Sequence, residues 1–264
     1  MSALPSATST PSSVRASCSQ QEWDARVDLA AAYRLAAQYG WHDLLGTHFS
    51  LRVPGEPDHY LVNPAGYFFE EITASSLVKI DLDGNQLSPS PNGVNPAADE
   101  IHGALYTARP DIQAIMHLHS VAGTAVGAQE GGLLPISQNA MLLLNRVRYY
   151  DYRGSRLPSE EWTRMAEQLG DGSVLFMRNH GTLAAGRSIG EAFALIARTE
   201  RACGIQVAAL AGGLKLHDVD AEVVRASIER GRTIYSDRHW SPKAKHEWAA
   251  FRRKADRDFP GYNA

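Results

Sequence analysis

The amino-acid sequence predicts a single α/β domain, with β-strands in the middle and α-helices outside. Segments with the alternating pattern of strands are interspersed with segments of helical periodicity along the 264 residues. No internal repeat and no linker divides the sequence, and this length suits one domain or at most two. Hydrophobic residues make up 44% of the chain, which is enough to bury a substantial core.

The first 20 residues are expected to form a disordered lead-in to the folded unit. They are rich in Ser, Thr, Ala and Pro, and they lack the apolar core of a secretion signal. Because the stretch contains Arg15 and no acidic residue, a transit peptide is the alternative. The domain itself is expected to span residues 21–235, and residues 236–264 are expected to form a C-terminal tail.

The first half of the domain is expected to begin with a helix and a β-hairpin. Apolar residues recur at helical spacing over residues 22–39, and Gly40 follows as a stop signal. Residues 48–53 alternate as a strand does, and the turn at 54–57 leads to a second strand at 60–62. Further elements expected here are strands at 77–82 and 114–118, a loop at 89–96 and a helix at 99–108.

The second half is expected to contain two more strands and one long helix. Strands at 174–177 and 182–185 flank a tight turn, and an Ala-rich helix follows at 189–214. The tail from His239 to Tyr262 mixes aromatic and basic residues, which are enriched at protein interfaces. It is therefore expected either to contact a neighbouring subunit or to be a frayed amphipathic segment.

Composition excludes several classes of function. The formal net charge is −3 and the sequence has no basic block, so neither nucleic acid nor an anionic membrane is expected as a partner. No apolar stretch approaches the roughly 20 residues of a membrane span. Cys18 and Cys203 are too few for a disulfide framework, which fits a reducing compartment and predicts a cytoplasmic protein.

Two histidines in the strand Ile115-Met116-His117-Leu118-His119 are the first candidate for chemistry. Side chains at positions i and i+2 of a strand share a face, so His117 and His119 lie about 7 Å apart on the same side. That separation allows both imidazoles to lean onto one metal ion at about 2.1 Å. A pair of this kind is a weak signal until a third ligand is found. His180, in the turn Asn179-His180-Gly181, is the candidate, although taken alone it reads as a turn histidine.

Several motifs in order resemble the class II aldolase and adducin family. They are FEEITASSLVKIDLDGN, ARPDIQAIMHLHS, GLLPIS, YYDYRG and LFMRNHGTLAAG. The resemblance runs from about Trp23 to Leu214 and implies a layered α/β/α fold with a central, mainly antiparallel sheet. It also implies one divalent metal ion per subunit, held by His117, His119 and His180. Zinc is the metal expected most, with manganese and iron(II) as alternatives, and the family usually forms homotetramers with metal sites between subunits.

The sequence departs from the sugar-phosphate aldolases of this family at an acidic position. Those enzymes carry an acid, which serves as metal ligand and general acid/base, four residues before a helix histidine that here is His102. The matching residue is Ala98. Asp99 and Glu100 follow at once, but on a helix they point about 100° and 200° away from it. Glu100 is therefore the candidate replacement, and a solvated acid at a helix start is the alternative.

The phosphate pocket of those aldolases also differs here. Ala65, Pro96 and Ala97 stand where the family has hydroxyl groups, and a phosphate dianion needs several hydrogen bonds. The substrate is therefore expected to be a non-phosphorylated small molecule. Asn63 and Gly66 remain candidates for contact with it.

Further candidates follow from the resemblance. His48 stands where the aldolases have the asparagine that binds the enediolate, and an imidazole that titrates near neutral pH could return a proton to a carbanion. The alternative for His48 is packing beside Arg52. Tyr152 is a catalytic candidate near the metal, or else a structural tyrosine. Gln138 and Asn139 lie where the family has groups on the substrate side.

These features predict a metal-dependent lyase, of decarboxylase or retro-aldol type, that acts on a non-phosphorylated keto or hydroxy acid through a metal-stabilised enolate. One alternative is a non-haem iron oxygenase that acts on an aromatic keto acid, since a three-histidine site can hold iron(II). The other is a non-catalytic, adducin-like binding protein. Adducins add a long, lysine-rich tail, whereas this sequence ends soon after the expected domain, so a stand-alone enzyme is favoured.

Overall fold

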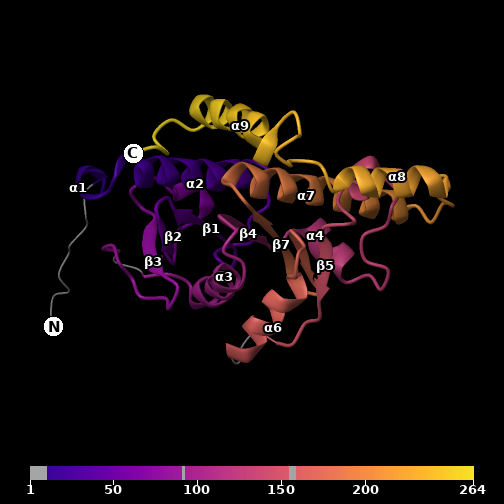
Figure 1. Ribbon diagram of the computed structural model, residues 1–264, viewed down its shortest axis with the longest axis horizontal. Helices are drawn as coiled ribbons and strands as arrows, with labels where there is room; N and C mark the ends of the chain where they lie inside the picture. The colour runs from indigo at the N-terminus through magenta and orange to yellow at the C-terminus, as the bar shows by residue number, and fades with distance from the viewer. Residues whose placement is uncertain (1–10, 91–92, 155–158) are drawn as a thin grey trace.

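The computed structural model describes residues 11–90, 93–154 and 159–264, and one seven-stranded sheet lies at its centre (Figure 1). The strand order is β3-β2-β1-β4-β7-β6-β5, and every neighbouring pair is antiparallel except β5 and β6. The strands are β1 His48–Val53, β2 Glu56–Val62, β3 Val78–Asp81, β4 Ala114–Leu118, β5 Val147–Tyr150, β6 Val174–Met177 and β7 Gly181–Gly186. The prediction of a single α/β domain with a mainly antiparallel sheet is confirmed.

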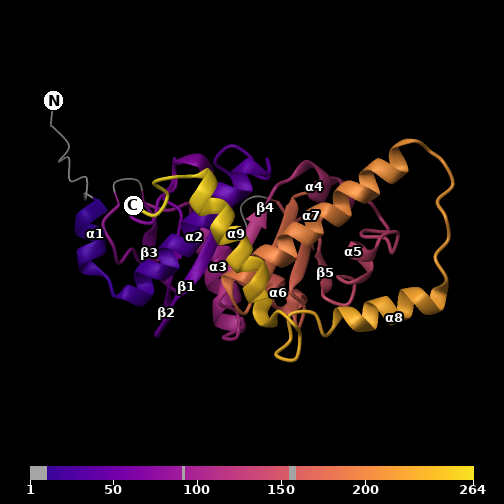
Figure 2. The ribbon, with the colours of Figure 1, turned by 90° about the horizontal axis from the view of Figure 1, so that it is seen from above.

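Helices cover both faces of this sheet. The α-helices are α1 Pro11–Ser17, α2 Gln20–Gln38, α3 Pro96–Ala108, α4 Val121–Gly127, α5 Gln138–Met141, α6 Ser159–Leu169, α7 Ile189–Ala211, α8 Ala221–Gly231 and α9 Lys245–Asp258, with short 3-10 helices at Phe69–Glu71 and Pro242–Ala244. Helices α2 and α7 pack on one face, and α9 lies over both of them (Figures 1 and 2). Helices α3 and α6 pack on the other face. The result is the layered α/β/α arrangement.

Strand alternation divides the apolar residues between two cores. On β4, Met116 and Leu118 belong to the core beneath α2 and α7, whereas Ile115 belongs to the core beneath α3 and α6. All three side chains have no accessible surface. Because successive strand residues point to opposite faces, His117 lies on the α3–α6 side of the sheet.

The helix and turn signals of the sequence correspond to local structure. The Ser19 side chain accepts a hydrogen bond from the Glu22 amide and caps the start of α2. Gly40 takes a φ of +69° just after that helix, and Gly55 takes +82° in the β1–β2 turn. Both angles lie in the left-handed region that glycine adopts at little cost, which explains why helix α2 and strand β1 end where they do.

The two ends of the described chain differ from the prediction. Residues 11–17 form α1 and Gln20 begins α2, so this part of the expected lead-in is helical, while residues 1–10 lie outside the described part. The expected tail is folded onto its own chain. Tyr262 is buried, and its carbonyl accepts a hydrogen bond from the Ala74 amide at 2.8 Å. This contact joins the C-terminal segment to the stretch of chain before β3.

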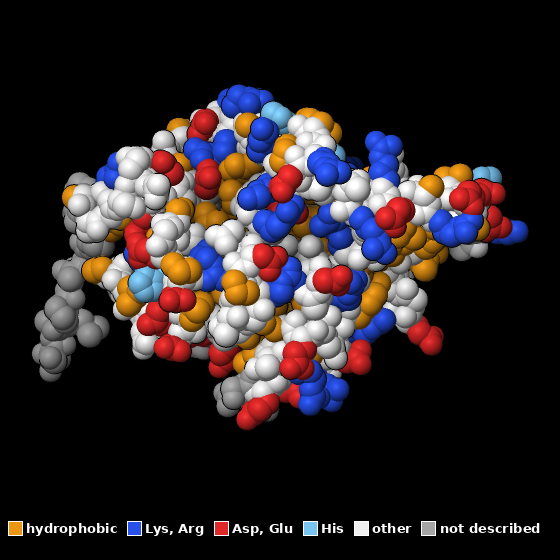
Figure 3. Space-filling view, in the orientation of Figure 1, with side chains coloured by type: hydrophobic (Ala, Val, Ile, Leu, Met, Phe, Trp, Pro, Cys, Tyr) orange, Lys and Arg blue, Asp and Glu red, His pale blue; other side chains and the backbone are white. Residues whose placement is uncertain are grey.

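Two properties of the surface bear on partners. Within the described ranges, no helix is both long enough and apolar enough to cross a membrane. On the face drawn in Figure 3, basic and acidic side chains are intermixed. This mixture agrees with the small net charge of the sequence.

Candidate metal centre

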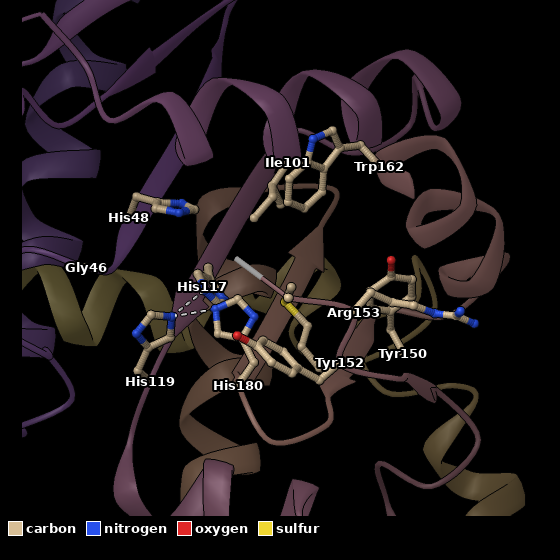
Figure 4. Close-up of a pocket in the computed structure, with 12 residues that line it drawn as sticks. Gly46, His48, Ile101, His117, His119, Tyr150, Tyr152, Arg153, Trp162 and His180 are labelled. Atoms are coloured by element: carbon tan, nitrogen blue, oxygen red, sulfur yellow. Dashed lines mark hydrogen bonds between the residues drawn. The ribbon is translucent and has the colours of Figure 1, made fainter. Parts of the chain in front are cut away.

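Three histidines, two from the end of one strand and one from a neighbouring turn, meet at one point (Figure 4). His117 is near the end of β4, His119 follows that strand, and His180 lies in the β6–β7 turn. The Nε2 atom of His119 is 2.9 Å from Nε2 of His117 and 2.9 Å from Nε2 of His180. The three side chains form a group that could hold a metal ion, with their ligand atoms all within 4.8 Å of one another.

Backbone geometry explains why His180 reaches the other two. β4 and β7 pair antiparallel with His117 opposite Leu183, so the β6–β7 turn lies beside the end of β4. In that turn Asn179 has a φ of +59°. A Cβ added at Gly181 would lie 2.2 Å from the Leu118 carbonyl oxygen, so only glycine permits this close approach of the two strands.

The outer nitrogens of two ligands fix which nitrogen is free for a metal. Nδ1 of His117 is 3.0 Å from the Thr182 carbonyl oxygen, which can only accept, so this nitrogen carries the proton. Nδ1 of His119 is 3.2 Å from the Asp43 carboxylate and donates in the same way. Both Nε2 atoms then present lone pairs to each other. With Nδ1 of each ring engaged elsewhere, two Nε2 atoms 2.9 Å apart suit a shared cation, and the hydrogen bonds at Nδ1 are those typical of metal-bound histidines.

Burial keeps these imidazoles in the form that binds metals. It lowers the pKa of His117 well below 6.5, with smaller contributions from the neighbouring histidines. Burial also lowers the pKa of His180 to about 4, and His119 adds to this shift. Neutral imidazole is the state that coordinates a metal, so no proton has to leave these two rings near neutral pH. The residues present therefore fit a divalent metal ion with nitrogen ligands.

His48 stands beside the triad on the adjacent strand. β1 pairs antiparallel with β4, and His48 is directly opposite His117, with ring centroids 5.0 Å apart. Only 1% of its surface is exposed, and burial lowers its pKa well below 6.5, with neighbouring imidazoles adding to the effect. Burial therefore favours the neutral form of the His48 imidazole in this site.

The four histidines line one end of a cavity of about 310 Å³. Ile101, Met177 and Trp162 form an apolar wall of this cavity. On the side away from His48 lie Tyr150, Tyr152 and Arg153 (Figure 4). The complete lining comprises Gly46, His48, Ile101, His117, His119, Tyr150, Tyr152, Arg153, Gly154, Trp162, Met177 and His180. No carboxylate of a described residue belongs to this lining. Ala98, which stands where the sugar-phosphate aldolases have their acid, is buried. Among the described residues, no other acidic side chain takes the place of that acid in the cavity lining.

Among the other sequence candidates, the structure brings Tyr152 to the cavity and leaves Glu100 outside it. The Tyr152 ring centroid is 6.3 Å from that of His180, and 53% of the residue is exposed. Glu100 is exposed on α3 and lines a separate hollow with Asp99 and Gly84. Since α3 begins at Pro96, the turn of the helix places the Glu100 side chain outside the histidine cavity of this chain.

The four substrate-side candidates also lie away from the histidines within this chain. Asn63 is buried with its Oδ1 atom 2.7 Å from the Tyr33 hydroxyl, and Gly66 occupies a turn with a φ of +81°. Gln138 and Asn139 are on α5 and line other hollows. The structure gives Asn63 a core contact, and none of the four lines the histidine cavity.

Sequence reasoning missed one buried partner and several wall residues. Nε2 of His102 is 2.8 Å from Nδ1 of His48, yet His102 was noted only as a reference point on a helix. Arg153, Trp162 and Tyr150 were not singled out. For Arg153 the signal was present, because it directly follows Tyr152 in the YYDYRG motif.

Comparison with known proteins agrees with this fold. A family model described as the class II aldolase and adducin N-terminal domain matches residues 27–207. A crystal structure of an aldolase II superfamily protein from Pseudomonas syringae has a TM-score of 0.89 and 43% identity, over 96% of this chain and 100% of that one. The chain belongs to the class II aldolase and adducin family.

Two curated relatives represent the two sides of this family. A candidate aldolase class 2 protein of Caulobacter vibrioides is 43% identical over 254 residues, which cover 95% of this chain and 96% of that protein. Alpha-adducin of Rattus norvegicus is 46% identical over 189 residues, which cover 70% of this chain and 26% of the adducin. The similarity to alpha-adducin therefore concerns about a quarter of that longer protein.

Proposed function

We propose that this protein is a metal-dependent carbon–carbon lyase for a non-phosphorylated keto or hydroxy acid. The convergence of three Nε2 atoms at the end of a cavity, with buried His48 on the adjacent strand, is the observation that carries the proposal. His117, His119 and His180 would hold one divalent ion, for which zinc fits the nitrogen donor set. That ion would act as a Lewis acid toward charge on a substrate oxygen.

The residues around the triad suggest how the substrate is oriented. Tyr152 offers a hydroxyl near His180, and Arg153 lines the opposite side of the cavity, where its guanidinium could attract an anionic substrate such as a carboxylate. Apolar side chains of Ile101, Met177 and Trp162 would exclude water from the reacting carbon. His48 would handle the proton through Nε2, because its Nδ1 atom is engaged with His102.

The absence of a carboxylate from the described lining supports cleavage without the acid of the sugar-phosphate aldolases. Retro-aldol cleavage and decarboxylation both leave an enolate, so the same site could serve either reaction. The alanines and proline in the former phosphate pocket support a substrate without phosphate. By family resemblance we also propose a homotetramer, which light scattering on the purified protein tests.

A direct assay tests the proposed activity. Protein loaded with zinc is offered panels of keto acids and hydroxy acids, while carbon dioxide and aldehyde products are measured separately. His117→Ala should abolish product formation, whereas His217→Ala, at an exposed position outside the site, should leave it unchanged. Turnover that persists in His117→Ala would refute the proposed site.

A second candidate function is that of a binding protein, which the 46% identity to alpha-adducin supports. This reading predicts that the metal-loaded protein turns over none of the acids. It also predicts that His48→Gln and wild type behave alike in every assay of binding. Iron in the purified protein together with consumption of oxygen would instead support the oxygenase alternative.

A further inference from the structure

A line of buried polar groups leads from the cavity into the layer between the sheet and α3. Nδ1 of His48 is 2.8 Å from Nε2 of His102, and Nδ1 of His102 is 2.5 Å from Oγ of Ser50. Ser50 Oγ is 2.8 Å from the Tyr106 hydroxyl, which donates to the Gln113 carbonyl at 3.3 Å. The four side chains are at most 1% exposed, so water does not compete for these hydrogen bonds.

The carbonyl at the far end gives this line a direction. The Gln113 carbonyl can only accept, so the single hydroxyl proton of Tyr106 is committed to it. The Tyr106 oxygen must then accept from Ser50, and Ser50 Oγ must accept from Nδ1 of His102. A neutral His102 protonated on Nδ1 has a bare Nε2, which must accept from Nδ1 of His48.

The alternative direction leaves a poorer set of hydrogen bonds. If Tyr106 donated to Ser50, every proton in the line would reverse and His48 would carry its proton on Nε2. The bond from Tyr106 to the Gln113 carbonyl would then be lost, although the two atoms face each other in the structure. His48 and His102 are both buried and lie next to each other, an environment that favours neutral rings with one proton each.

We propose that His102, Ser50 and Tyr106 form a positioning relay that holds His48 protonated on Nδ1. This tautomer leaves an unprotonated Nε2 as the nitrogen available to the cavity. The relay acts through His48 and touches no substrate itself. Ser50 belongs to β1, and His102 and Tyr106 belong to α3. Packing of α3 against the sheet therefore determines which nitrogen of His48 carries the proton.

The relay also narrows the substrate class, and this step rests on the proposed lyase function. A bare Nε2 recognises a hydrogen-bond donor, so the group facing His48 should be a hydroxyl rather than a carbonyl. A hydroxy acid with its hydroxyl β to the carbonyl meets this requirement. As its carbon–carbon bond breaks, the hydroxyl proton passes to Nε2, the hydroxyl carbon becomes an aldehyde or ketone, and the bonding pair goes to the enolate.

Replacing Tyr106 tests the direction of the relay. In Tyr106→Phe the Ser50 hydroxyl loses its acceptor and can donate only to Nδ1 of His102. Both imidazoles should then reverse, and His48 should become protonated on Nε2. Tyr60→Phe is the matched control, because Tyr60 is a buried tyrosine whose ring lies tilted against that of Tyr106, with centroids 5.0 Å apart, but outside the relay.

The measurement is ¹⁵N NMR of histidine-labelled protein, as purified, at pH 8, with His48→Gln used to assign the His48 signals. The proposal expects a protonated Nδ1 on His48 in wild type and in Tyr60→Phe, and a protonated Nε2 in Tyr106→Phe. A protonated Nε2 in wild type, or an unchanged tautomer in Tyr106→Phe, would overturn it. Neither outcome depends on turnover, so failure of the relay and failure of the lyase assignment are separate results.

Kinetics give a second readout once a substrate is known. Tyr106→Phe should lower kcat on a β-hydroxy acid by about 10-fold to 100-fold with little change in KM, since the change removes a proton acceptor and leaves metal binding intact. A change confined to KM would contradict the positioning role. Tyr60→Phe should match wild type in both constants.

Discussion

The buried carboxyl group of Glu200 offers a quantitative test of the packing beneath the metal centre. Glu200 lies on α7 with 7% of its surface exposed. Burial raises its pKa from 4.5 to about 7, partly opposed by the hydroxyls of Ser120 and Thr182. Ser120 follows His119, and the Thr182 carbonyl accepts a hydrogen bond from His117, so this carboxyl group lies near the backbone that carries two ligands.

The sign of the effect follows from proton binding. The folded protein binds the Glu200 proton more tightly than the unfolded chain, so this group favours folding at low pH. Its contribution is complete below pH 4.5 and is lost as the pH rises through about 7. Each tenfold difference in proton affinity is worth about 1.4 kcal/mol, so the total loss is about 3 kcal/mol.

Glu200→Gln removes this dependence, because a neutral amide replaces a carboxyl group of the same size. The free energy of unfolding of the variant, minus that of wild type, should increase by up to about 3 kcal/mol between pH 5 and pH 8. Urea unfolding of both proteins at equal concentration measures this difference. Glu167→Gln, at an exposed position on α6, should show no such trend. A difference for Glu200→Gln that is constant with pH would refute the reasoning.

Two further predictions concern the site itself. Gly181→Ala should lower the free energy of unfolding by about 1–3 kcal/mol and reduce metal content, because the added Cβ meets the Leu118 carbonyl oxygen. Gly204→Ala, where a Cβ meets nothing within 4 Å, should instead stabilise α7 by about 0.5–1 kcal/mol in the same thermal or urea experiment. His48→Gln should retain the metal of wild type while turnover falls by about 10²-fold to 10⁴-fold, and loss of the metal in this variant would show that His48 is a ligand.

Local patterns predicted the strands that carry the site. Alternation defined β1 and β4 with the bounds that the structure gives, and the two-residue spacing placed His117 and His119 on one side. The long helix α7 was also evident from composition, although it ends at Ala211 rather than Leu214. These features depend on residues that are close in the sequence, which is why the sequence alone could predict them.

Features that depend on packing between segments far apart in the sequence could not be predicted from local patterns. His180 joins the triad because β7 pairs with β4, and only the family motifs pointed to that pairing. His102 meets His48 because α3 packs across the sheet, 54 positions away in the sequence. The short strand β5, with Arg148 in its middle, has too weak a pattern to stand out. Glu100 lies outside the histidine cavity because packing sets the rotation of α3 about its axis, and the sequence does not reveal that rotation.

The central claim is that His117, His119 and His180 hold one divalent metal ion, and metal content tests it most directly. Elemental analysis of wild type, purified without added metal, should give about one divalent ion per chain, with zinc expected. His119→Ala should retain less than about a tenth of that amount, whereas His217→Ala should match wild type. Equal metal in His119→Ala and wild type, or no metal in wild type even after incubation with zinc, would contradict the account.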